Sequence, residues 1–89
     1  LFRSGESVVR QDIREVLTVQ GRLSVDADQI AGNANLYELG LTSHASVNVM
    51  LALEDKFDIE FPDEALTKAT FTSIDSIERV VADLADVGA

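Results

Sequence analysis

Residues 43–57, SHASVNVMLALEDKF, constrain the fold most, because their apolar side chains recur at helical spacing around an unusually wide arc. At about 100° per residue, the apolar arc of a helix built from this stretch spans roughly 200°. An ordinary surface helix needs an apolar stripe of only about 100° to face its core. The stretch therefore predicts a helix that packs in a bundle and leaves one apolar edge outside the core.

The two edges of this arc have different expected environments. Val49, Leu53 and Phe57 cluster on one edge, which we expect to be buried. Val47 and Leu51 lie on the other edge beside the start of the helix, and we expect them to be partly exposed. Because a small exposed apolar patch often marks a docking site, this edge predicts contact with another protein.

Negative charge gathers at the end of the same helix. Glu54 and Asp55 occupy its last turn, where the helix dipole disfavours each carboxylate by roughly a few tenths of a kcal/mol. Glu54 also lies inside the apolar arc, where a carboxylate is not fully buried without a partner. The net charge of −9 disfavours nucleic acid and anionic membranes as partners and favours basic protein surfaces. An acidic surface that only keeps a small domain soluble is the alternative that this pattern leaves open.

The rest of the chain predicts an all-α fold, a four-helix bundle with a short third helix and a long loop between the first two helices. The first helix is expected at residues 7–20, the loop at 21–41, the third helix after Pro62 in DEALTKA, and the fourth helix after a capping Ser73. The apolar residues expected to hold the loop on the core are Leu23, Val25, Ile30, Leu36, Leu39 and Leu41. The inner stripe of the fourth helix is expected to be Ile74, Ile77, Val80, Val81 and Leu84.

The chain's length is that of one domain, and we expect a single domain over residues 1–89. Leu1 is not an initiator methionine, so we expect residues 1–5 to be disordered or a remnant outside the fold. The sequence has no cysteine, no secretory signal and no apolar run near the roughly 20 residues that a membrane-spanning helix needs. These features predict a soluble cytoplasmic protein, which we expect to be a monomer.

Three polar residues, Thr42, Ser43 and His44, precede the apolar part of the helix, although a helix start needs only one capping oxygen from Thr42 or Ser43. A serine nucleophile with a histidine base is disfavoured, because neighbouring helical residues point about 100° apart and the G-x-S-x-G motif is absent. The segment DADQIAGN does not have the ligand spacing of a calcium loop, so no metal is expected. Two interpretations of Ser43 stay open: a plain capping serine, or a hydroxyl that another enzyme modifies with a phosphodiester favoured by the positive helix start.

From Leu36 to about Val81 the chain resembles the acyl and peptidyl carrier proteins. Residues 39–44, LGLTSH, occupy the position of that family's LG-x-DSL turn, which opens its second helix. Residues 47–66, VNVMLALEDKFDIEFPDEAL, look like the family's second helix, its Phe-Asp turn and its Pro-Asp-Glu entry to the third helix. Thr42 stands in place of the usual Asp and His44 in place of the usual Leu. TFTSIDSIERVV is closer to the peptidyl type, and the chain is compatible with discrete carriers charged with amino acids by stand-alone ligases.

The resemblance implies that Ser43 receives 4′-phosphopantetheine from coenzyme A through a phosphopantetheinyl transferase. The arm's thiol would hold an acyl or aminoacyl group as a thioester for fatty-acid or natural-product biosynthesis, and the chain itself would not be an enzyme. The implied partners are a loading ligase and downstream transferases with basic surfaces. The residues implied to dock them are Thr42, His44, Val47, Leu51, Glu54 and Asp55. The alternative is a non-carrier acidic helical module that only binds a basic protein.

Overall fold

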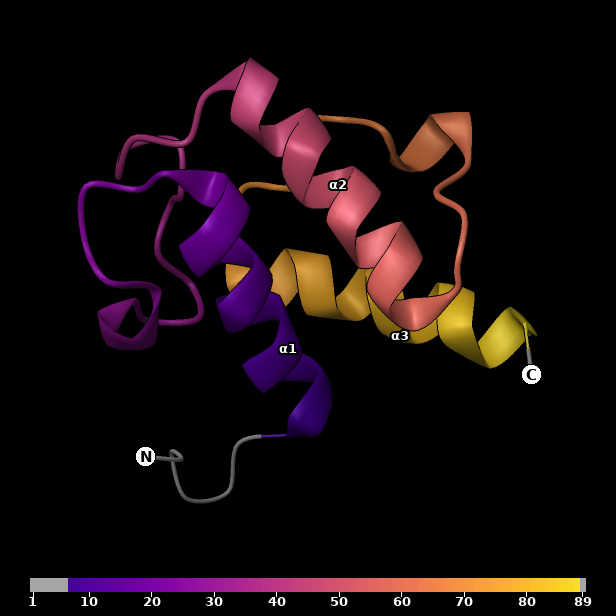
Figure 1. Cartoon of the computed structure of the whole chain (residues 1–89). Coiled ribbons are helices and arrows are strands. Elements are labelled where there is room, and N and C mark those ends of the chain that lie inside the picture. The colour runs from indigo at the N-terminus through magenta and orange to yellow at the C-terminus, as the bar shows by residue number, and fades with distance from the viewer. Residues whose placement is uncertain (1–6, 89) are drawn as a thin grey trace.

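A computed structural model describes residues 7–88, which contain three α-helices and, within that range, no strand. The α-helices are α1 (Val8–Val16), α2 (Ser43–Phe57) and α3 (Ile74–Gly88). Three shorter helical segments join them, the π-helical η1 (Leu17–Gly21) and the 3-10 turns η2 (Ala27–Gln29) and η3 (Asp63–Ala65). In Figure 1 the α1–α2 connection lies on one side of the molecule, and the α2–α3 connection starts on the other side and passes behind α2 to the start of α3. The expected all-α fold is confirmed, and the expectation for residues 1–5 lies outside the described residues.

The helix boundaries follow from local chemistry. Ser7 caps α1, because its Oγ accepts from the N–H of Arg10 at 3.1 Å. The first helix then continues through η1 and stops at Arg22, which adopts a left-handed conformation with φ of 51°. Ser73 caps α3 as expected, since its Oγ accepts from the N–H of Ser76 at 3.1 Å. The predicted second helix has the same bounds as α2.

The predicted third helix is only the single 3-10 turn η3. Its hydrogen bonds run from Ala65 N–H to the Pro62 carbonyl and from Leu66 N–H to the Asp63 carbonyl, the spacing of a 3-10 turn. Leu66 then leaves helical geometry with φ of −86° and ψ of 62°, so the turn does not propagate. The fold is therefore three α-helices plus one turn where a short helix was expected.

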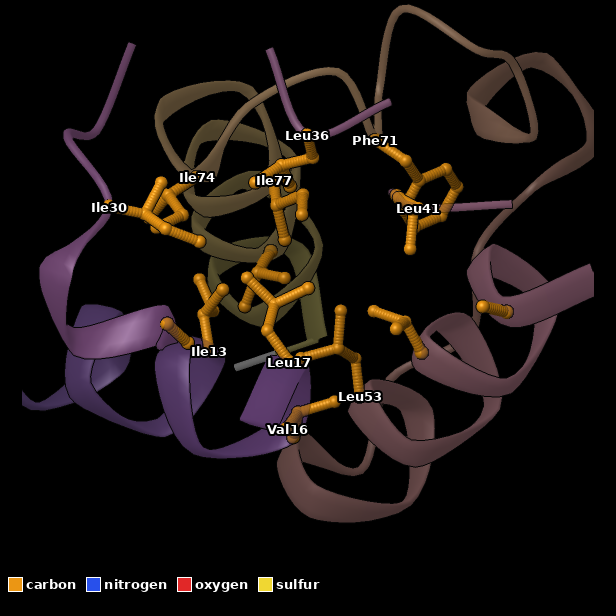
Figure 2. Packing of buried hydrophobic residues seen from close by; sticks show 14 of the residues in the cluster. Ile13, Val16, Leu17, Ile30, Leu36, Leu41, Leu53, Phe71, Ile74 and Ile77 are labelled. Atoms are coloured by element: carbon orange, nitrogen blue, oxygen red, sulfur yellow. The ribbon is translucent and has the colours of Figure 1, made fainter. Parts of the chain in front are cut away.

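One core fills the space between the three helices and the long connection (Figure 2). Val49 and Leu53 are fully buried as expected, whereas Phe57 is half-buried. On α3 the expected inner stripe is confirmed, with Val80 and Leu84 packed at its partly buried rim. The fully buried large side chains are Ile13, Leu17, Leu36, Leu53, Ile74, Ile77, Val49 and Val81.

The connection between η1 and α2 is held at several points along its length. Ile30, Leu36 and Leu41 are buried as expected, but Val25 is 45% exposed, so its expected role as an anchor is wrong. The chain bends at Val25 after Ser24 bonds the Leu39 carbonyl through both its N–H and its hydroxyl, and the valine turns to solvent. At the far end, the N–H of Leu36 donates to the Thr72 carbonyl at 2.7 Å.

A buried arginine also holds this connection. The side chain of Arg14 is 3% exposed, and its Nη1 donates to the carbonyls of Ala27 at 2.6 Å and Ile30 at 2.8 Å. These two carbonyls lie at the start of η2 and just after it. A buried guanidinium is tolerated only when its donors find acceptors, and here two backbone carbonyls of the connection accept from it. Arg14 therefore fixes an aperiodic segment that has little regular structure of its own.

A second arginine joins α1 to α3 at the molecular surface. Arg10 donates through Nε and Nη2 to Oε1 of Glu78 at 2.9 and 2.6 Å, and its Nη2 also pairs with Asp75. Burial alone would lower the pKa of Arg10, but the hydrogen bonds and charges of Glu78 and Asp75 outweigh it and raise that pKa above its usual value. The N–H of Asp75 also donates to the Gly32 carbonyl at 2.9 Å, so this cluster ties down the middle of the connection.

Replacing Arg14 by Met should lower the free energy of unfolding by roughly 2–4 kcal/mol, because the carbonyls of Ala27 and Ile30 lose the bonds that the guanidinium donates. Urea unfolding measures this change, and amide exchange across residues 24–35 should become faster in the same variant. The matched control is Arg79→Met on the exposed face of α3, expected to change stability by less than about 0.5 kcal/mol. Equal stabilities for the two variants would contradict the role given to Arg14.

Candidate functional site

Thr42 is the residue that caps α2. Its backbone is extended, with φ of −98° and ψ of 164°, and its Oγ1 accepts from the N–H of Ala45 at 3.0 Å. The Thr42 carbonyl accepts the first intrahelical bond, from the N–H of Ser46 at 2.9 Å. Of the two capping residues that the sequence allowed, the structure selects the threonine.

Ser43 is therefore not needed as a cap. It is the first residue of α2 and is exposed, and its hydroxyl makes no hydrogen bond to any residue of the described range 7–88. The nearby Ser46 hydroxyl is engaged, since it donates to the Ser43 carbonyl at 2.7 Å. Two serines one turn apart thus differ in chemistry, and only the hydroxyl of Ser43 is free to react.

The turn before α2 directs Ser43 to the surface. Gly40 has φ of +110°, a conformation that a side chain would strain. The N–H of Gly40 donates to the Tyr37 carbonyl at 3.3 Å and the N–H of Leu41 to the Leu36 carbonyl at 3.0 Å. This turn places Leu41 in the core and leaves Thr42 and Ser43 outside it.

A groove of about 460 Å³ opens beside Ser43, between α2 and the segment that precedes α3. Its volume falls within the range of about 300–1,000 Å³ typical of small-molecule sites. The lining residues are Tyr37, Leu41, Ser43, Ser46, Val47, Met50, Leu66, Thr67, Lys68 and Phe71. The free hydroxyl thus lies at the edge of a partly apolar hollow large enough for a flexible organic group.

The exposed apolar edge predicted for α2 is present. Val47 is 51% and Leu51 53% exposed, on the helix that begins at Ser43. Thr42, His44 and Asp55 are exposed as well, so each of the five can be reached by a partner.

Glu54 differs from the other residues expected to dock partners. It is half-buried, and its Oε2 accepts from the N–H of Phe61 at 2.9 Å. This bond is the partner that a carboxylate inside the apolar arc requires, and it folds the chain after α2 back onto the helix. Glu54 therefore has a clear structural role, and its role in docking stays a prediction.

Two important residues were missed at the sequence level, Arg14 and Lys68. The ammonium of Lys68 lies 4.9 Å from the centre of the Tyr37 ring, and both residues line the groove beside Ser43. Neither the Lys68–Tyr37 contact nor the burial of Arg14 follows from periodicity, because both join segments distant along the chain.

No group of three or more His, Asp or Glu side chains in residues 7–88 is placed to hold a metal ion. No helix in that range is both long and apolar enough to cross a membrane.

The two hydroxyls at the start of α2 should differ in their effect on stability. Thr42→Ala should lower the free energy of unfolding by about 1 kcal/mol because α2 loses its cap, and Thr42→Asp should restore it. Ser43→Ala should change it by less than about 0.5 kcal/mol, since the serine hydroxyl bonds to nothing in the described fold. Denaturant unfolding of the three variants checks this, and a greater loss for Ser43→Ala than for Thr42→Ala would contradict the assignment of the cap.

The sequence matches the phosphopantetheine attachment site family over residues 8–86. It is 49% identical over 74 residues to an aminoacyl carrier protein from Agrobacterium fabrum, covering 83% of this chain and 89% of that protein. The fold matches a chain in the crystal structure of an engineered Bradyrhizobium japonicum glycine:[carrier protein] ligase complexed with a carrier protein from Agrobacterium tumefaciens and AMP. That match has a TM-score of 0.80 and 48% identity, over 82% of this chain and 97% of the other. A chain in the structure of the B. japonicum ligase with glycylated carrier protein matches with a TM-score of 0.72 and 31% identity, over 83% of this chain and 99% of the other. The chain therefore belongs to the phosphopantetheine attachment site family and is a carrier protein of the acyl and peptidyl carrier type, with 4′-phosphopantetheine as its covalent cofactor.

Proposed function

We propose that this chain carries an amino acid as a thioester on a 4′-phosphopantetheine arm attached to Ser43. The observation that carries the proposal is the state of the Ser43 hydroxyl, which is exposed, unbonded within the described residues and placed at the start of α2. Once attached, the arm supplies a thiol that holds the cargo. The chain is not an enzyme, and partner enzymes perform the chemistry on the cargo.

The residues around Ser43 suit attachment of a flexible phosphodiester. In the modification, the Ser43 oxygen bonds to the phosphorus of coenzyme A next to the pantetheine, and adenosine 3′,5′-bisphosphate leaves. The hydroxyl proton passes to a base of the transferase, because no side chain of residues 7–88 hydrogen bonds to the Ser43 hydroxyl to accept it. The groove beside Ser43 gives the arm room, and Thr42 keeps the helix start capped without help from the serine.

The proposed cargo is an amino acid, and glycine is the first candidate. Support comes from the 49% identity to an aminoacyl carrier protein and from the fold shared with carriers complexed with a glycine:[carrier protein] ligase. By this argument the loading partner is an aminoacyl ligase, followed by transferases that accept the amino acid. Because coenzyme A supplies the arm, we place the protein in the cytoplasm, and we propose that it acts as a monomer.

We further propose that partners dock on the exposed edge of α2. Val47 and Leu51 offer apolar contact area next to the attachment site, while Thr42 and His44 flank Ser43 directly. Asp55 adds negative charge at the far end of the helix, which complements basic partner surfaces. Glu54 contributes charge at this end of α2, although Oε2 of its carboxylate is occupied by the Phe61 N–H.

Modification at Ser43 is tested with coenzyme A, Mg²⁺ and a promiscuous phosphopantetheinyl transferase. The intact mass should rise by one phosphopantetheine, and Ser43→Ala should abolish the rise because the attacking oxygen is gone. Ser46→Ala is the matched control, a serine one turn further along α2 that should leave modification intact. No mass gain, or a gain that survives Ser43→Ala, would overturn the proposal and favour an acidic module that only binds proteins.

Docking is tested by loading the modified protein with a glycine:[carrier protein] ligase. Val47→Asp or Leu51→Asp should lower kcat/KM for loading by about tenfold, because a charge replaces an apolar contact near the centre of the surface. Val8→Asp is the control, since Val8 is 71% exposed at the start of α1, on a different helix from Ser43. Equal loading of all three variants and the parent protein would place the ligase contact elsewhere.

A further inference from the structure

Lys68 stands out among the charged residues of this acidic domain. It is the one cationic residue that lines the groove beside Ser43, and within residues 7–88 it forms no ion pair with any carboxylate. Lys56, in contrast, lies 3.8 Å from carboxylates of both Asp12 and Glu15. In a chain with a net charge of −9, a lysine without a carboxylate partner is an unused site for an anion.

The position of the Lys68 ammonium is restrained. Its Nζ lies 4.9 Å from the centre of the Tyr37 ring, within the range of a cation–π contact. Tyr37 belongs to the turn that precedes α2, and Lys68 to the segment between η3 and α3. The contact therefore holds the charge at the groove wall.

We propose that Lys68 is a positioning residue that pairs with the phosphodiester on Ser43 and lays the arm along this groove. The inference rests on the proposed attachment at Ser43. A phosphodiester carries one negative charge, which the acidic surface of the domain repels and the positive start of α2 attracts. Among the side chains that line the groove, only that of Lys68 adds a positive charge to this attraction.

The remaining lining of the groove suits the rest of the arm. Val47, Met50 and Leu66 offer apolar surface for the paired methyl groups of the pantetheine. The groove is open, and an ion pair at a solvent-exposed lysine is weak. The arm should therefore exchange between the groove and solvent, so that a partner enzyme can withdraw it at little cost.

The test uses the protein loaded with one phosphopantetheine, confirmed by intact mass, and measures NOEs between the pantetheine methyl groups and side chains of the groove. In the parent protein these NOEs should appear at Val47, Met50 and Leu66. In Lys68→Gln the ratio of groove-bound to free arm should fall about two- to fivefold, as expected for loss of one exposed ion pair. Lys68→Arg should retain most of the effect because it keeps the charge. Raising the salt concentration should weaken the NOEs in the parent protein more than in Lys68→Gln.

The matched control is Arg79→Gln, which removes one positive charge from the exposed surface of α3 and should leave the NOEs unchanged. Amide spectra of the unloaded variants should superpose away from residues 66–70, which shows that the fold is kept. A loaded protein without these NOEs, or with equal NOEs in Lys68→Gln and the parent, would overturn the role of Lys68 and leave attachment at Ser43 standing. Failure of the mass to rise at Ser43 would overturn both.

Discussion

The buried guanidinium of Arg14 is the contact on which the arrangement of the site depends. The segment between η1 and α2 has no sustained helical or strand pattern, so its backbone needs partners from elsewhere. Arg14 supplies two donors to the carbonyls of Ala27 and Ile30, and the Leu36–Thr72 bond closes the other end. With both ends fixed, the Gly40 turn delivers the chain to the start of α2 in one orientation. Ser43 is therefore positioned by contacts made well away from it.

At the start of α2, the residues that stabilise the fold differ from the residue whose hydroxyl is free. The Thr42 hydroxyl accepts from the N–H of Ala45, and Leu41 packs the preceding turn on the core. Ser43 follows them as the first residue of α2, and its hydroxyl makes no hydrogen bond to any described residue. A carrier protein needs this separation, because its modified side chain must leave the fold unchanged when the arm is added. The exposed edge of α2 is a similar case, because apolar side chains that are not buried in the core remain available to contact partners.

Much of the fold could be predicted from the sequence, because local periodicity and capping encode it directly. The bounds of α2, the cap of α3 and the exposure of Val47 and Leu51 all follow from patterns within a few turns of helix. A third α-helix was predicted because DEALTKA has helical composition. Only a 3-10 turn forms there, because the chain leaves helical geometry at Leu66. The predicted burial of Val25 was wrong because an apolar residue in an aperiodic segment has no neighbouring pattern that fixes the direction of its side chain.

The position of Ser43 at the start of a helix could be predicted from the sequence, but several contacts near it could not. Ser43 stands in a recognisable turn, whereas the bond of Glu54 to Phe61 depends on how the chain folds back after α2. Arginine and lysine are usually exposed, so nothing in the sequence marks Arg14 as buried or Lys68 as held over Tyr37. Such contacts are set by tertiary packing and become visible only when distant segments are brought together.

Attachment of an aminoacylated arm to Ser43 can be measured by intact-mass and fragmentation analysis of the protein purified from its native host. We expect one phosphopantetheine per chain, fragment ions that locate it on Ser43, and a population with an amino acid on the thiol. An unmodified Ser43 in natively purified protein, or an arm located on another residue, would contradict it.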